Sequence, residues 1–269
     1  MKFLLLFIFF SCLLSCASNK TSEVVRNESV ELNLSYETDS LNQQTILGIP
    51  LADRVIDFSV KTIGSVLEKE AAKYKASYFA SKVGKDFYET KVINGKENRS
   101  LKYNTLEIVR KAGIPQEKVA NIQFKFEFDE SGYFFRLRPH YIKIDKTKAK
   151  RNLKDETIDL IIDVTLFGYW VINGLEYHSE AVSESSFNIR NIKVGEILND
   201  PNILREYTSD WLVSAPISSN KIGELVGNGN YKFEVIISEV DDFGEKVEKA
   251  SIHFKDNETK IIELLKNKQ

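Results

Sequence analysis

The amino-acid sequence predicts an α+β fold, in which an antiparallel β-meander carries one long helix packed on the sheet and the C-terminus is helical. Several segments alternate apolar and polar residues, which is typical of half-buried strands, whereas residues 51–83 and 243–265 place apolar residues at helical spacing. The composition, with 42% hydrophobic and 28% charged residues, is that of a folded globular domain. We therefore expect one domain over residues 30–269.

A strand is expected first, because Val30, Leu32 and Leu34 alternate with polar residues. One long helix follows over residues 51–83, with Pro50 at its start. Its apolar stripe consists of Ile56, Val60, Ile63, Leu67, Tyr74 and Tyr78. The stripe suits either a partner protein or the chain's own sheet, and we favour the sheet because tyrosines fit a broad face better than a coiled-coil seam.

The middle of the chain predicts a short helix over residues 104–111 and then strands over residues 122–128, 133–141 and 157–172. Pro139 marks an edge or a kink, because proline has no amide hydrogen to donate.

Asn173 and Gly174 give the clearest hairpin signal in the chain. A two-residue type I′ turn there pairs Ile172 with Leu175 and Trp170 with Tyr177. Strands over residues 186–192 and 231–240 follow, and helical spacing begins at Phe243.

The first sixteen residues, MKFLLLFIFFSCLLSC, have the organisation of a secretory signal. Lys2 precedes an apolar run of about twelve residues, which is too short to cross a bilayer as a helix. The run ends in a motif that resembles the lipobox of bacterial lipoproteins, with leucine three positions before the cysteine and a small residue immediately before it. Its residues are Leu13, Leu14, Ser15 and Cys16.

This resemblance implies processing and a location. In bacterial lipoproteins the cysteine receives a diacylglycerol, the peptide is cut before it, and the new amine is usually acylated, often with palmitate. Here residues 1–15 would be removed, Cys16 would carry the lipid anchor, and residues 16–29 would form a polar tether. Ala17 and Ser18 stand where the enterobacterial inner-membrane retention signal has aspartate, so we expect the outer membrane of the cell envelope.

Two alternatives to lipidation at Cys16 are open. Cys12 is a second candidate, although Phe9 would then take the leucine position. A plain signal peptide with two incidental cysteines is the other alternative. With Cys12 removed and Cys16 lipidated, the domain keeps no cysteine for a disulfide, a thiolate metal site or a nucleophile.

Basic residues mark a candidate anionic-ligand patch, suited to lipid headgroups, lipopolysaccharide or an acidic partner. The patch consists of Arg136, Arg138, Lys146, Lys148, Lys150 and Arg151. A merely solvated hairpin tip is the alternative. Trp211, between Pro201 and Pro216, is a candidate aromatic contact for a sugar or a partner protein, or else packs under a loop.

The sequence contains no motif for catalysis or metal binding. His178 lies between Glu176 and Glu180, but alternation alone produces such a row on a solvated strand. No metalloprotease, nucleophile-elbow or phosphate-loop motif is present. We expect no enzyme activity, no metal and no cofactor beyond the lipid on Cys16, and the net charge of −2 gives no reason to expect nucleic acid.

The sequence therefore predicts a membrane-anchored envelope lipoprotein with a non-enzymatic structural or protein-interaction role. Its partners would be the membrane, through the lipid anchor, and an envelope protein. The alternative is a surface lipoprotein that binds a glycan or an amphiphile through Trp211 and the basic patch. The third and least favoured hypothesis is a hydrolase.

Overall fold

The computed structural model describes residues 27–35, 73–129, 133–150 and 156–241, together with Lys246 and Lys249. In these segments the chain consists mainly of strands, and the helix between β10 (Ile197–Leu198) and β11 (Leu212–Val213) is the five-residue α3 (Pro201–Arg205). The fold is therefore β, and the prediction of an α+β fold is wrong.

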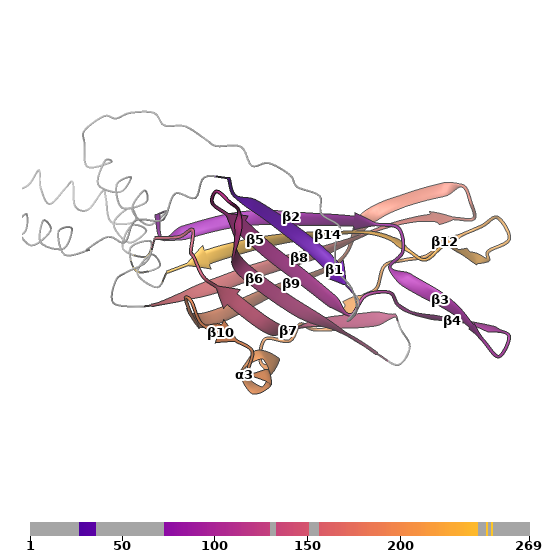
Figure 1. The fold of residues 1–269 in the computed structure, drawn as a ribbon. Coiled ribbons are helices and arrows are strands. Elements are labelled where there is room, and N and C mark those ends of the chain that lie inside the picture. Colours follow the sequence, from indigo (N-terminus) through magenta and orange to yellow (C-terminus); the bar gives the residue numbers. More distant parts are fainter. Residues whose placement is uncertain are drawn as a thin grey trace, which may run out of the picture.

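Two antiparallel sheets face each other as the layers of a sandwich (Figure 1). The first has the order β1-β5-β6-β7-β10, and β11 also pairs with β7. Its strands are β1 (Ser29–Ser35), β5 (Thr105–Ala112), β6 (Glu117–Phe128), β7 (Phe134–Ile144), β10 (Ile197–Leu198) and β11 (Leu212–Val213). The second has the order β2-β14-β8-β9. Its strands are β2 (Lys75–Gly84), β8 (Thr157–Ile172), β9 (Glu176–Lys193) and β14 (Asn230–Val240).

Two small hairpins complete the described strands. One consists of β3 (Tyr88–Ile93) and β4 (Lys96–Leu101), and the other of β12 (Ser218–Ser219) and β13 (Leu225–Val226). Both project beyond the sandwich (Figure 1).

The core lies between the two sheets and is filled by the apolar side chains that alternation assigns to one face of each strand. Phe124 of the first sheet packs against Phe187 of the second, with ring centroids 4.8 Å apart. Leu160 and Ile162 of β8 and Val235 of β14 are completely buried. The strands predicted from residues 30, 122, 157 and 231 onward are confirmed, because their period-two pattern reflects this buried face.

The predicted long helix is wrong over its C-terminal part, which forms β2. Tyr78 and Ala80 point into the core and Phe79 and Val83 point outward, as in a strand. The pairing of β2 with β14 along the whole length of β2 overrides the helical spacing of the tyrosines. Residues 51–72 lie outside the described segments, and so does the expected helix from Phe243 apart from Lys246 and Lys249.

The predicted short helix over residues 104–111 is also wrong, because this segment is the strand β5. Leu106 and Ile108 are buried against the core with two-residue spacing, and both neighbouring strands are antiparallel to β5. Pro139 lies beside a register shift between β6 and β7, in agreement with the predicted kink.

The turn at Asn173 and Gly174 is confirmed in position and in its left-handed conformation, but the predicted two-residue loop and its pairing are wrong by one residue. Asn173 and Gly174 have φ of 51° and 65°, the left-handed conformation that this turn requires. Trp170 pairs with His178 instead of Tyr177, because Leu175 is a third loop residue and leaves the ladder. The Trp170 and His178 rings consequently stack, with centroids 5.3 Å apart.

Candidate functional site

The two ends of the sandwich carry different features (Figure 1). The chain enters β1 at one end, which we call the tether end, where the Glu28 carboxylate lies 3.1 Å from the Lys148 ammonium. Three hairpins project from the opposite end, which we call the hairpin end. They comprise residues 88–101, 168–180 and 218–226.

The three hairpins are joined to one another by hydrogen bonds. The amide of Gly174 donates to the carbonyl of Ser219 at 2.9 Å, and the amide of Asn173 donates to the Ser219 hydroxyl at 2.9 Å. The Arg99 guanidinium of β4 reaches the carbonyl of Leu225 in β13 at 3.5 Å. These bonds between residues far apart in sequence make the hairpin end one structural unit.

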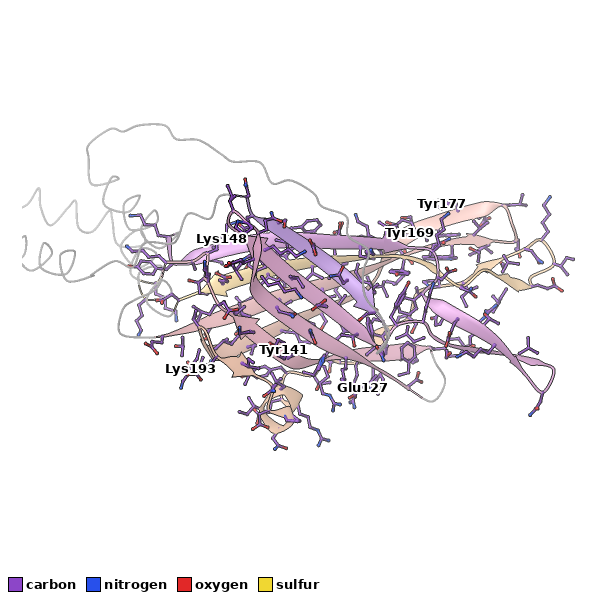
Figure 2. The ribbon with its side chains drawn as sticks, viewed as in Figure 1. Glu127, Tyr141, Lys148, Tyr169, Tyr177 and Lys193 are labelled. Carbon is purple, nitrogen blue, oxygen red and sulfur yellow. The ribbon has the colours of Figure 1, made fainter. Side chains whose placement is uncertain are left out.

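Large apolar side chains are exposed on all three hairpins. They are Val92, Ile172, Leu175, Tyr177, Ile222, Leu225 and Val226. Ile222 is 84% exposed and Leu175 is 75% exposed, and Figure 2 shows Tyr177 on the projecting β8–β9 tip. Full burial of one such side chain is worth about 1.5–3 kcal/mol, so a partner that covered several would gain substantial binding energy. Single exposed apolar residues are ordinary, but seven on adjacent hairpins make this end the candidate interaction site.

Two contacts between titratable side chains lie on the hairpins. Lys91 lies 2.6 Å from Glu89, and its ammonium holds the pKa of the Glu89 carboxyl below the ordinary value. Glu176 lies 3.7 Å from His178. The local Lys91–Glu89 pair suits the polar rim of an apolar contact better than recognition of a highly charged ligand.

The structure divides the predicted basic patch between two places. Arg136 and Arg138 lie on β7, and both contact the same carboxylate, that of Glu127, at 2.6 Å and 2.5 Å. Lys146 follows ten residues after Arg136, which corresponds to about 33 Å along an extended strand. Lys148 and Glu127 are accordingly well separated in Figure 2.

The lysine group of the patch, Lys146, Lys148 and Lys150, lies at the tether end, and each member makes local contacts there. Lys148 pairs with Glu28, and the ammonium of the buried Lys150 lies 5.0 Å from the centre of the Tyr74 ring. Lys146 accepts a hydrogen bond through its carbonyl. Arg151 and Cys16 lie outside the described residues.

Trp211 belongs with the arginine group. It precedes β11, which pairs with β7 beside Arg136, and its ring is about half exposed. The Arg136 guanidinium lies 4.9 Å from the ring centre, a cation–π contact. Trp211 is therefore not buried under a loop. One face of its ring contacts Arg136, and part of the ring remains accessible to a sugar or a partner protein.

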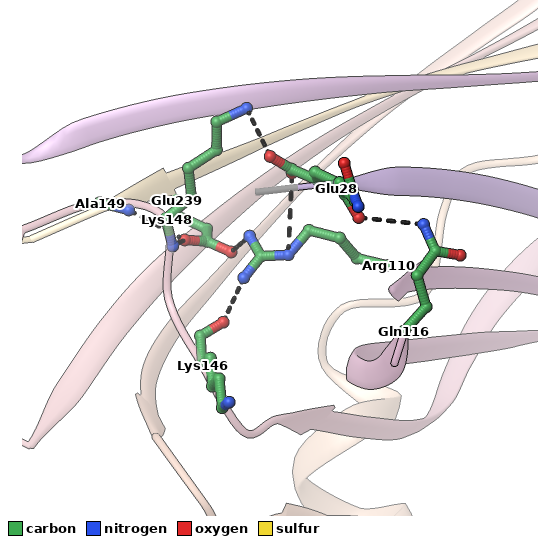
Figure 3. Close-up of polar contacts among 8 residues, drawn as sticks. Glu28, Arg110, Gln116, Lys146, Lys148, Ala149 and Glu239 are labelled. Atoms are coloured by element: carbon green, nitrogen blue, oxygen red, sulfur yellow. Dashed lines mark hydrogen bonds and ion pairs between the residues drawn. The ribbon is translucent and has the colours of Figure 1, made fainter. Parts of the chain in front are cut away.

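The tether end contains a buried ion cluster that the sequence interpretation missed (Figure 3). Arg110 donates to Glu239 at 2.6 Å, and both side chains are at most 1% exposed. The second Glu239 oxygen accepts from the amides of Lys148 and Ala149, while Arg110 also donates to the Lys146 carbonyl. Burial raises the pKa of Glu239, although Arg110 and the two amides act in the opposite direction.

A signal for this cluster was present in the alternation. Arg110 continues the inward face of Leu106 and Ile108, and Glu239 continues that of Val235 and Ile237. Two opposite charges at inward positions of two strands predict a buried pair, because an unpaired buried charge is very costly. Both terminal nitrogens of Arg110 and both oxygens of Glu239 contact protein groups, which suits a structural role.

Histidine and acidic residues do not form a metal cluster in the described part of the chain. His178 is engaged by Trp170 and Glu176. Among the described helices, none is long and apolar enough to cross a membrane.

The described residues form an antiparallel β-sandwich in which the chain enters β1 at one end and exposed apolar side chains gather on three hairpins at the other. No protein-family model, curated protein or solved structure matches this chain.

Proposed function

We propose that this protein is a membrane-anchored envelope lipoprotein with a non-enzymatic role, and that it presents its hairpin end to another envelope protein. The observation that carries this proposal is the opposition of the two ends. The chain enters the sandwich at Glu28, and the exposed apolar side chains of three joined hairpins lie at the far end (Figure 1).

The dimensions suit presentation away from a membrane. The sixteen residues of β8 span about 53 Å at the rise of an extended strand. A tether of residues 17–28 reaches at most about 40 Å when fully extended. An anchor at Cys16 would therefore hold the hairpin end tens of ångströms from the bilayer.

A protein partner is favoured over a glycan by the chemistry of the tips. The exposed side chains there are mainly aliphatic, as in Leu175, Ile222 and Leu225. Protein interfaces bury such groups in a central contact surrounded by polar residues, whereas glycans are held by aromatic stacking and hydrogen bonds. The arginine group around Trp211 is the part of the surface that suits the glycan alternative.

The experiment is chemical crosslinking in intact cells followed by affinity purification from membranes. We expect a stoichiometric protein partner with the wild-type chain and its loss with the double variant Leu175→Asp and Ile222→Asp. Ile203→Asp is the matched control, because Ile203 is an exposed isoleucine on α3, away from the hairpins.

Partner recovery that is equal in the double variant and the control would contradict the hairpin end as the contact. Binding of the purified chain to protein-free lipid vesicles, lost in the double variant, would instead assign this end to a membrane.

A further inference from the structure

A tryptophan ring and two arginines lie together on the outer face of the first sheet, where β11 pairs with β7. Arg136 and Arg138 alternate with buried residues of β7, so their side chains point away from the core. They are 38% and 37% exposed, and Trp211 is 48% exposed. We call these three residues and Glu127 the tryptophan site. Figure 2 shows Glu127 well away from Tyr177 on the hairpin end.

The backbone around Trp211 is fixed on both sides of the ring. Before it, the Ser209 amide donates to the Leu137 carbonyl, and the Leu137 amide donates to the Ser209 hydroxyl, both at 2.9 Å. After it, β11 pairs with β7, and the Val213 carbonyl accepts from the Ser183 hydroxyl of the second sheet at 2.9 Å. A ring held in this way loses little conformational freedom when a ligand covers it, so the site is preorganised.

The side chains around the ring hold one another in place. The guanidinium carbon of Arg136 lies 4.9 Å from the ring centre of Trp211, and its Nε donates to a Glu127 oxygen at 2.7 Å. Arg138 contacts the other oxygen of the same carboxylate. A guanidinium carries five N–H donors in a planar fork. Because more than a third of each arginine side chain is exposed, a ligand can reach these donors from solvent.

The charges beside the tryptophan ring leave an excess of positive charge. Lys125 is the cross-strand partner of Arg138, and Asp210 immediately precedes the tryptophan. With the two arginines of the site and Glu127, these residues supply three cations against two carboxylates. A guanidinium recognises a carboxylate or a phosphate through two parallel hydrogen bonds. The site therefore combines an accessible aromatic ring with donors for an anionic group.

We propose that the tryptophan site binds an acidic sugar, that is, a pyranose ring that carries a carboxylate or a phosphate group. The C–H groups of the pyranose pack on the accessible part of the Trp211 ring, and the anionic group accepts from a guanidinium. Glu127 is an acceptor for the sugar hydroxyls. This site is separate from the hairpin end, and the proposal does not depend on what the hairpin end binds.

The test is isothermal titration calorimetry of the full-length chain in detergent micelles. A tetrasaccharide of glucuronic acid should bind at least about tenfold more tightly than the tetrasaccharide of glucose, which differs from it only in lacking the carboxylates. A phosphorylated glucose tetrasaccharide is the second acidic probe, and the tighter of the two identifies the anionic group. Trp170→Phe leaves Trp211 as the single tryptophan of the chain, so its fluorescence should change on binding.

Matched variants then identify the residues. Trp211→Ala should weaken binding by about tenfold, whereas Phe79→Ala, at a half-exposed aromatic residue of the second sheet, should leave it unchanged. Arg138→Gln should reduce the affinity for the acidic probes to that for the glucose tetrasaccharide. Arg190→Gln is its control, at an exposed arginine of β9. Circular dichroism confirms that each variant remains folded.

Four outcomes would overturn the proposal. The first is no heat of binding from either acidic tetrasaccharide at concentrations on the order of millimolar. The second is equal affinity for inorganic phosphate or for a hexaglutamate peptide, which would mean that the site recognises charge alone or an acidic protein. The third is an affinity that Trp211→Ala leaves unchanged. The fourth is loss of binding in the double variant Leu175→Asp and Ile222→Asp, which would assign the sugar to the hairpin end.

Discussion

The buried pair of Arg110 and Glu239 gives the most quantitative prediction. Arg110→Met removes the cation and leaves a carboxylate that is 0% exposed and keeps the amides of Lys148 and Ala149 as donors. Breaking a buried pair from one side typically costs about 3–5 kcal/mol, a large part of the stability of a domain. We expect the free energy of unfolding, measured by urea titration at neutral pH, to fall by about this amount.

The pH dependence follows from the raised pKa of Glu239. A carboxyl group whose pKa is higher in the folded than in the unfolded protein binds its proton more tightly when folded. Its contribution to stability is therefore present below the unfolded pKa and is lost as pH rises through the folded pKa. Arg110 lowers this pKa, so its removal raises the pKa further, and the loss in Arg110→Met should shrink as the pH is lowered.

Two further variants make the reasoning refutable. Glu239→Gln added to Arg110→Met removes the unpaired charge and keeps an acceptor for the two amides, so it should recover much of the loss. Arg136→Met is the matched control at a half-exposed pair and should cost at most about 1 kcal/mol. If Arg110→Met costs no more than Arg136→Met and its loss is independent of pH, the buried pair does not stabilise the fold as described.

Two other predictions concern the anchor and the packing of the hairpin end. Cys16→Ala should abolish incorporation of a fatty-acid probe, and labelling that persists would exclude this cysteine as the lipid site. Gly168→Ala should lower the free energy of unfolding by about 1–3 kcal/mol, because a β-carbon at this position would lie 2.6 Å from Pro216 Cδ. Gly195→Ala is the comparison without a steric contact, because a β-carbon there meets no atom within 4 Å and only the φ of 87° is unfavourable for alanine. Thermal unfolding of both variants measures the two losses of stability.

The sequence predicted the strands whose two faces differ most. In β8, Leu160, Ile162, Val164 and Leu166 face the core and polar residues face outward, so the period of two is clear. The prediction for the β2 segment was wrong because Tyr74 and Tyr78, four residues apart, fit both a helical stripe and one face of a strand. Only the long-range pairing with β14 distinguishes the two, and it involves residues 147 to 165 positions later in the chain.

The candidate sites were predicted less well for a related reason. Composition identifies Arg136 and Arg138 as basic, but their shared carboxylate, Glu127, belongs to the neighbouring strand and is defined by the register. The hairpin end needs three separate turns to meet, which local patterns do not encode. The Asn173–Gly174 turn was predicted. That its exposed neighbours form part of a larger apolar end follows only from the positions of the other two hairpins in the structure.

The position of β14 has a consequence for biogenesis. This strand is the last one described in the chain, yet it lies between β2 and β8 in the interior of the second sheet. The sheet therefore cannot close until residues 230–240 have been synthesised and have found partners from both earlier parts of the chain. Topologies dominated by such distant pairings fold slowly. If the chain is exported through a narrow channel, as proposed, slow closure of the sheet would keep the chain unfolded enough to pass until β14 has crossed.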